Sequence, residues 1–168
     1  MLIAAGAEVN YQYESTTALF DACYNHNYEI FESLLHAGAD VNVQKEGQTV
    51  LHALIRQLQV QYKISTFYSA GSVASLQAKS RYTEAIEIYE KIIELVLSRT
   101  NILLKAKDKE GKTAFDLVKQ RLTRDDLDEK RKDALKKIKN LIEARWERQK
   151  ELKNPFETTR FQINSQAC

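Results

Sequence analysis

Residues 106–113, which read AKDKEGKT, carry the residue types of a phosphate-binding loop. Such a loop turns backbone N–H groups toward the anion, and a lysine and the N-terminus of the next helix add positive charge. Here alanine stands in place of the first glycine, the loop interior has no glycine, and Asp108 and Glu110 would lie against the phosphates. No later apolar strand that ends in aspartate offers a magnesium ligand. We therefore expect no nucleotide site and no cofactor.

The histidines and cysteines form no set that is typical of catalysis or metal binding. His52 would need a nucleophile and an orienting acid, and no spacing in the chain supplies them. The two cysteines, Cys23 and Cys168, belong to no CxxC or Cys/His metal motif. We expect Cys23 to be packed rather than reactive, Cys168 to be an exposed thiol, and His36 to face solvent at a helix end. The chain is predicted not to be an enzyme, and its cysteine usage favours the reducing cytoplasm.

Positive charge gathers toward the C-terminal end of the chain. Residues 119–153 carry 13 Lys/Arg against 8 Asp/Glu, whereas residues 1–118 carry 11 against 14. The basic run at 130–139 could meet phosphates, but acidic residues interrupt or flank it, and no aromatic residues are interleaved for base stacking. We interpret the run as a solvated helix face and do not expect nucleic-acid binding. No segment approaches the roughly 20 apolar residues of a membrane span, so we expect no membrane partner.

The sequence repeats itself at a fixed interval. LLHAGADVN at residues 34–42 matches LIAAGAEVN at residues 2–10, 32 residues earlier, and NVQKEGQT at residues 42–49 has the shape of the AKDKEGKT loop. Gly38 follows the last apolar-periodic residue, where a helix ends in the left-handed conformation that glycine adopts at little cost. The single proline and the five glycines favour a mostly helical chain. The repetition therefore predicts stacked helical units, which explain the loop without a phosphate.

Three segments carry the motif that opens each unit. TALFDA at 17–22, TVLHAL at 49–54 and TAFDLV at 113–118 resemble the TPLHxA motif of the ankyrin repeat, and from 17 to 42 the resemblance runs without a gap. It implies an all-α fold, an ankyrin-repeat solenoid of stacked helix pairs with short β-hairpin-like loops and a long C-terminal capping helix. In this family the histidine at the position of His52 generally supports neighbouring turns by hydrogen bonding.

The spacing of apolar residues agrees with helix pairs. Each threonine that opens a motif can cap a short first helix. A second helix follows with apolar residues three or four positions apart. Such a pair cannot bury its apolar face alone, so pairs must stack. The inward positions are predicted to be Leu19, Ala22, Leu51 and Leu54 in the first helices, and Ile30, Phe31, Leu34 and Leu35 in the second helix of the first full repeat.

We predict one ankyrin-repeat domain over residues 1–154 and a C-terminal tail over 155–168. Its parts are a partial repeat at 1–10, repeats at 11–42 and 43–105, and a terminal repeat with the capping helix at 106–154. The 64 residues between Thr49 and Thr113 nearly fit two repeats, but the start signal expected near Arg81 is absent. We favour one repeat with an insertion at about 59–82. The insertion is either a recognition element or a tolerated elongation.

In this interpretation the first helix runs on into the insertion. The second helix resumes at 83–97, with Ala85, Ile88, Ile92 and Val96 on one face. After Val96 the chain lacks the AGADVN pattern, so this junction is expected to depart most from a regular stack.

Both ends of the domain are distinctive. The first repeat starts partway, so its earlier part is expected to lie upstream, leaving the face around Leu19 and Phe31 poorly covered and open to self-association. One long helix is predicted over 129–154, before Pro155, with Leu135, Ile138, Leu141, Ile142 and Trp146 inward. The tail is expected to be extended and to dock through Phe156 and Phe161.

The resemblance implies a protein-protein interaction module that binds another protein through hairpin tips and the concave face of the first helices. Tyr13, Tyr24 and Arg56 are the first candidates, because tyrosine and arginine most often carry interface energy. The alternative is a substrate-recruiting or regulatory portion of a larger enzyme, including an effector that an intracellular pathogen delivers to the host cytosol. The full predicted surface comprises Tyr13, Glu14, Thr16, Tyr24, Asn25, Lys45, Glu46, Gln48, Arg56, Gln57, Lys109, Glu110, Lys112, Gln120 and Arg121.

Overall fold

The described residues form six helices and one short hairpin. The computed structural model describes residues 6–14, 16–25, 27–65 and 73–153, and within these it describes only the backbone of 59–65, 73–82 and 153. The predicted tail at 155–168 lies outside the described residues. In chain order the elements are α1 (Ala18–Tyr24), α2 (Tyr28–His36), β1 (Gln44–Lys45), β2 (Gln48–Thr49), α3 (Val50–Ser65), α4 (Val73–Ser98), α5 (Ala114–Leu122) and α6 (Glu129–Lys153).

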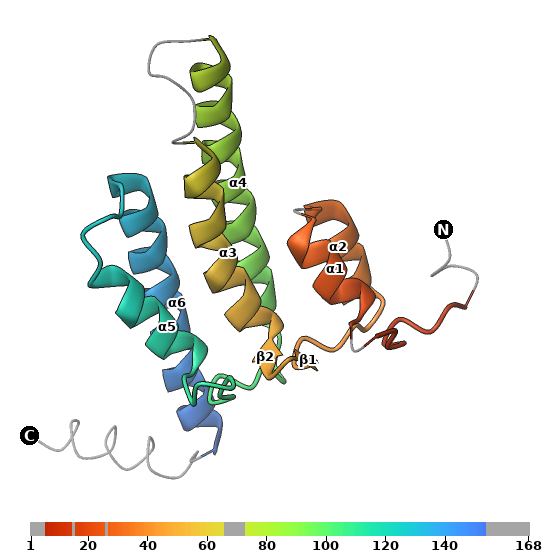
Figure 1. Cartoon of the computed structure of the whole chain (residues 1–168). Helices are drawn as coiled ribbons and strands as arrows, with labels where there is room; N and C mark the ends of the chain where they lie inside the picture. The colour runs from red at the N-terminus through yellow and green to blue at the C-terminus, as the bar shows by residue number, and fades with distance from the viewer. Residues whose placement is uncertain (1–5, 15, 26, 66–72, 154–168) are drawn as a thin grey trace, which may run out of the picture.

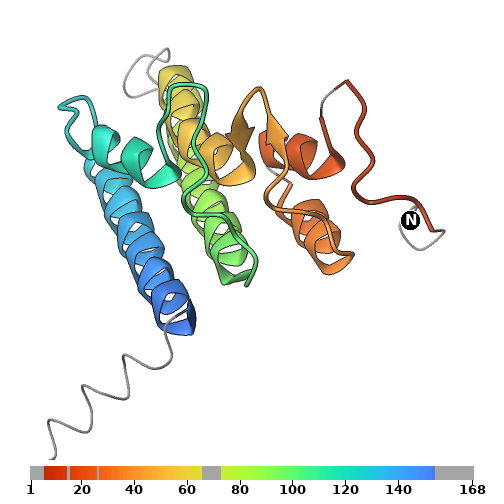
Figure 2. The same cartoon turned by 90° about the horizontal axis from the view of Figure 1, so that it is seen from below.

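The helices lie in two rows of three. Figure 2 shows α1, α3 and α5 in one row and α2, α4 and α6 in the other. Each helix contacts its partner across the rows and the next helix along its own row. Figure 1 shows the α3/α4 pair reaching farther than the pairs on either side. The prediction of an all-α chain with short hairpin-like loops is thus confirmed in its coarse form.

The loops between pairs carry short stretches of strand pairing. β1 and β2 are antiparallel, with Gln44 opposite Thr49 and Lys45 opposite Gln48. Isolated bridges join Tyr13 to Thr16 and residue 107 to residue 113 in the flanking loops. The hairpin and the loop that precedes α5 lie side by side in Figure 2. The first two loops therefore share a two-residue turn, whereas the bridge in the third loop encloses five residues.

Capping residues fix where the short helices begin and end. Thr17 accepts a hydrogen bond from the backbone N–H of Phe20, and Thr113 forms a capping box with Asp116. At the end of α2, Gly38 has φ +90°, and the backbone N–H groups of residues 38 and 39 donate to the carbonyls of residues 35 and 34. This is the Schellman pattern, so the predicted glycine stop is confirmed.

One continuous core joins the two rows, and it corrects two of the predicted faces. Leu19 and Phe31 are buried, so the prediction that they would be poorly covered is wrong. Their helices pack on α3 and α4, and this burial removes the reason given for self-association. Ile30, by contrast, was predicted to point inward and is 52% exposed. A stripe predicted from 3–4 spacing is wider than the face that the next pair can cover.

The α4 helix differs from the prediction in its start and in its face. It begins at Val73, not at residue 83, and α3 continues to Ser65, so much of the predicted insertion is helix. Ile92 and Val96 are buried as predicted, whereas Ile88 is only partly buried, and Tyr89 and Ile93 widen the buried face. α4 packs against α2, α3 and α6, and three contacts bury a wider face than one.

Candidate protein-binding surface

Three tyrosines stand exposed at the N-terminal end of the described chain. Tyr11 is 63% exposed, Tyr13 is 64% exposed, and Tyr24, the last residue of α1, is 43% exposed. The backbone of Tyr13 exchanges hydrogen bonds of 3.0 and 2.9 Å with Thr16, which holds this turn in place. Burial, together with nearby Cys23 and the charge of Glu46, raises the pKa of Tyr24. Tyr11 was not among the residues predicted from the sequence. This residue directly follows Asn10 of the AEVN pattern, as Val43 directly follows Asn42 of the ADVN pattern.

Two glutamates occupy matching turns in an uncommon backbone conformation. Glu14 has φ +48° and Glu46 has φ +51°, and both are exposed. In the β1/β2 hairpin, Glu46 and Gly47 form a two-residue loop in which both φ angles are positive, as in a type I′ turn. Asparagine, aspartate or glycine is preferred there, and a glutamate costs about 1 kcal/mol or more. Folding alone therefore does not explain these two carboxylates.

Arg56 is tied to the next loop rather than free. Its Nη2 atom lies 2.7 Å from Oδ2 of Asp108 and 3.5 Å from Oε1 of Glu110. The Asp108 side chain is fully buried, and 29% of the Arg56 side chain is exposed. Lys112 extends the network through Nζ to Glu110 at 3.1 Å and to Gln120 at 3.0 Å. The structure thus brings four residues of the predicted surface together around a carboxylate that the prediction left out.

Asp108 also organises the loop that resembles a phosphate-binding loop. Its Oδ1 accepts the backbone N–H groups of Glu110 and Lys112, both at 2.9 Å, and its carbonyl accepts the N–H of Gly111. Burial opposes its ionisation, yet these N–H donors and Arg56 hold its pKa below the usual value. The donors that would face a phosphate are turned onto an internal carboxylate. Asp108 accepts from backbone N–H groups two and four positions after it, which is typical of an Asx turn. This turn pattern could have identified Asp108 in the sequence.

His52 joins the hairpin to the same loop, as the resemblance implied. Its Nε2 atom lies 3.1 Å from the carbonyl oxygen of Lys112, and its Nδ1 atom lies 2.7 Å from the hydroxyl of Thr49. A carbonyl only accepts, so Nε2 carries the proton and Nδ1 accepts from Thr49. The ring is buried, and this burial lowers its pKa, which favours the neutral form. His52 therefore acts as a structural connector.

Two asparagines connect successive loops in the same way. Asn10 donates to the carbonyl of Gly38 and accepts from the N–H of Asp40. Asn42 donates to the carbonyl of Asn101 and accepts from the N–H of Leu103. The two hydrogen bonds of Asn10 span 28 and 30 residues of sequence, and those of Asn42 span 59 and 61. Each of these asparagines is the last residue of the repeated ADVN or AEVN pattern. The pattern did not predict that they link successive loops.

The loop after α4 departs from this regularity, as predicted. None of residues 99–106, which follow α4 directly, has a positive φ, whereas Gly6 and Gly38 both do. Side chains of α6 substitute for the missing turn: Arg145 donates to the carbonyl of Arg99, and Gln149 donates to that of Ile102. The capping helix thus ends the row with polar contacts as well as apolar ones.

The remaining residues of the predicted surface differ in exposure. Thr16 is half-buried and donates to Asp21, and Asn25 is exposed and bonds back to the same residue. Arg121 contributes its stem to a small cavity with Leu127 and Arg131. The lysine at 45 and the glutamines at 48 and 57 are half-buried, whereas Lys109, Glu110 and Gln120 are exposed.

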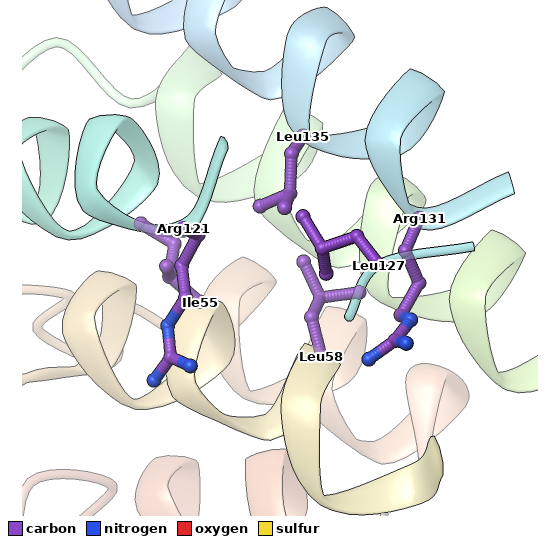
Figure 3. A pocket seen from close by; sticks show the side chains of 6 residues that line it. All are labelled: Ile55, Leu58, Arg121, Leu127, Arg131 and Leu135. Carbon is purple, nitrogen blue, oxygen red and sulfur yellow. The ribbon is translucent and has the colours of Figure 1, made fainter. Parts of the chain in front are cut away.

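That cavity is too small for a ligand. Figure 3 shows the two arginines on either side of a group of leucines, and the enclosed space is about 10 Å³, no more than one water molecule requires. Arg121 has a lowered pKa because of burial and the nearby positive charges. Elsewhere in the described ranges, no three His, Cys, Asp or Glu residues could hold a metal ion.

The basic run on α6 is mostly engaged in ion pairs. Lys130 pairs with Glu87, and Lys137 pairs with both Glu90 and Glu94 across to α4. Arg131 is buried and pairs with Asp128 at 2.8 Å. The run therefore serves packing of α6 on α4, and little unpaired charge is left for a polyanion. Within the described part of the chain, no helix is long and apolar enough to cross a membrane.

Comparison with known proteins confirms the family of the central segment. Residues 19–62 match the family model of ankyrin repeats (many copies), a segment that runs from α1 into α3. No curated protein matches the chain. The ankyrin resemblance read from the motifs is thus confirmed over these residues, and ankyrin repeats are generally non-catalytic modules of protein interaction. The repeat boundaries outside them stay a prediction.

Proposed function

We propose that this ankyrin-repeat chain binds another protein through the exposed tyrosines and hairpin tips at its N-terminal end, the surface formed by Tyr11, Tyr13, Glu14, Tyr24 and Glu46. The observation that carries the proposal is that some exposed side chains along the rows bond to the next loop and others do not. The described hydroxyls of the three tyrosines make no hydrogen bond with other described residues, and the two glutamates occupy costly turns. Exposed tyrosines commonly supply interface energy, because they bury a large ring at a low entropy cost.

Arg56 is a weaker candidate than the two tyrosines named with it. Its guanidinium already binds Asp108, so a partner would have to share or break a 2.7 Å ion pair. Replacing it would also disturb the loop that Asp108 organises. Loss of binding in an Arg56 variant would therefore mix two effects, and Tyr13 and Tyr24 are the cleaner probes.

The stacked solenoid is part of the same proposal. Its support is the two rows of helices together with the two asparagine links, which repeat from loop to loop. A solenoid offers an extended surface along the first helices and loops. We place the binding surface at one end of that surface.

Site-specific crosslinking tests the proposal. A photoreactive phenylalanine analogue at position 13 or 24 should capture a discrete partner in cell extract, whereas the same group at His36, which is exposed on α2, should not. The captured protein, once purified, should bind the Tyr13→Ala/Tyr24→Ala variant about 30-fold or more weakly, as expected for interface hot spots. Equal capture at all three positions, or equal affinity for the variant, would refute the assignment.

The cytoplasm is the location that we infer for the chain. Cys23 is a free, buried thiol, and burial raises its pKa to about 12. A buried protonated thiol is inert and fits a reducing compartment. Imaging of a tagged full chain would test this location, and a secreted signal would contradict it.

A further inference from the structure

A recess lies between the loop after α4 and the last turns of α6. It encloses about 590 Å³, a volume within the range of sites that hold small molecules or side chains. Its lining is mostly apolar, and the apolar residues that form it are Ile102, Leu103, Leu104, Ala106, Trp146 and Leu152. Its position follows from the irregular loop described above, because α6 covers the end of the row there.

Two leucines at this recess are exposed to an unusual degree. Leu103 is 60% exposed and Leu152 is 75% exposed, whereas the neighbouring Ile102 and Leu104 are buried. Leu103 stands where the regular turn has Asp40, since Asn42 holds its N–H as Asn10 holds that of Asp40. Both exposed leucines line the same recess, and exposed apolar side chains that gather at one place indicate a surface that is covered.

The two charged residues that line the recess are both positive. Lys105 and Lys150 line it, and no Asp or Glu does. The Lys105 Nζ lies 5.5 Å from the centre of the Trp146 ring, and Lys150 pairs at the surface with the exposed Glu147. An occupant should therefore combine an apolar side chain with an adjacent carboxylate.

The chain itself supplies such a segment directly beyond the recess. Leu152 lines the recess, and residues 155–161, PFETTRF, follow within three positions. Pro155 cannot continue a helix, and Phe156 and Glu157 provide the apolar side chain and the carboxylate side by side. A tether this short holds a segment at a millimolar effective concentration, so even weak affinity gives substantial occupancy.

We propose that residues 155–161 dock into this recess, with Phe156 on the apolar floor beside Trp146 and Glu157 facing Lys105 and Lys150. Phe161 lies five residues farther along, and each extended residue adds about 3.5 Å, so it can reach Leu103. The tail is then a covering strap for the end of the row, and its contacts are separate from the tyrosine surface.

Fluorescence of Trp146 tests the proposal directly, because it is the one tryptophan of the chain. In the full chain, the Phe156→Ser/Phe161→Ser variant should show red-shifted emission. Its acrylamide quenching constant should be about twofold higher, as expected if the tethered segment covers the ring for at least half of the time. A matched control is Thr158→Ser/Thr159→Ser, which keeps both phenylalanines and should behave as the parent. A Leu103→Lys variant, changed on the recess side at an exposed position, should raise quenching as well.

Three outcomes would overturn the docking. One is equal quenching in the parent and in the phenylalanine variant. Another is protection of Trp146 that disappears on dilution, which would assign the recess to the tail of a second copy. The third is failure of a synthetic peptide of residues 155–168, at millimolar concentration, to restore protection to the phenylalanine variant. The Tyr13→Ala/Tyr24→Ala variant should leave quenching unchanged, so this test and the partner test fail independently.

Discussion

The first helices of successive pairs use equivalent positions for opposite purposes. Counted from Thr17 and Thr49, the threonines that open the two motifs, Phe20 corresponds to His52 and Tyr24 corresponds to Arg56. In the second pair both side chains reach across to the next loop, the histidine to a carbonyl and the arginine to a buried carboxylate. In the first pair Phe20 is buried in the core and Tyr24 stays largely exposed.

This difference shows how one backbone pattern separates stability from recognition. The junction between α3 and α5 is joined by a hydrogen bond and an ion pair that are partly shielded from water, which strengthens such contacts. The N-terminal end is joined through apolar burial and Asn10, which leaves its aromatic side chains available. We therefore expect substitutions at the junction to cost stability and substitutions at the N-terminal end to cost binding.

The largest expected effect is at the centre of the junction. Asp108→Ala should lower the free energy of unfolding by about 3 kcal/mol, because it leaves Arg56 and two backbone N–H groups without their acceptor. This value is at the lower end of the loss expected for a broken buried ion pair, because Arg56 is partly exposed. Urea denaturation of the full chain measures it. Glu110→Ala removes an exposed carboxylate that pairs with Arg56 at 3.5 Å and with Lys112 at 3.1 Å. It serves as the control, with little change expected from such surface pairs. Similar midpoints for the two variants would contradict the role of Asp108.

Two glycines give a second test of the junction. Gly47 and Gly111 both have φ +75°, but a Cβ at Gly47 would lie 3.2 Å from the backbone N of Lys109, whereas a Cβ at Gly111 would meet nothing within 4 Å. Gly111→Ala should cost about 1 kcal/mol through backbone strain, and Gly47→Ala about 1 kcal/mol more through the close contact between loops. Thermal or urea unfolding compares them. Equal losses would mean that the two loops separate without cost.

The equivalent positions Tyr24 and Arg56 offer the most direct comparison. Arg56→Ala should destabilise the fold by about 1.5 kcal/mol, because Asp108 keeps its N–H donors but loses its counter-ion. Tyr24→Ala should change stability by about 0.5 kcal/mol or less, as expected for a largely exposed side chain. If Tyr24→Ala proved the more destabilising of the two, the proposed division between stability and recognition would be wrong.

The smallest effect is the pH dependence that His52 contributes. Burial depresses its pKa in the folded state, so the unfolded chain takes up the proton first as the pH falls. The stabilisation is present above the unfolded pKa of about 6.5 and is lost as the pH drops below it. Unfolding midpoints between pH 7.5 and 5 should decline, and His52→Gln should decline less. The carboxylates with lowered pKa values, such as Asp108, titrate below this range.

Much of the local structure could be predicted from single residues. Threonine before an apolar pattern marks a helix start, and glycine after it marks the stop, because both act on backbone groups within a few positions. Thr17, Thr113 and Gly38 behave in this way. The buried face of α4 is wider than predicted, and Ile30 is exposed, because a stripe of apolar residues does not say how many neighbours will cover it.

The candidate surface was predictable in its location but not in its internal roles. Arg56 and Tyr24 were given equal weight, since both residue types are common at interfaces. Whether such a side chain is free depends on a partner that lies 52 residues away in the sequence, in the case of Asp108. Tyr11 was missed because nothing in its neighbours distinguishes an exposed tyrosine from a packed one.

The sequence by itself determined the helix pairs, their punctuation and the ankyrin character of residues 19–62, because these depend on short-range backbone chemistry and on a fixed interval. Only the tertiary structure decided which side chains bind the neighbouring loop and which remain exposed. Hydrogen bonds such as that from Asn42 to Asn101 and ion pairs such as Arg56 to Asp108 form between residues that folding brings together. Their strength comes from burial, which no residue has until the rows of helices have packed.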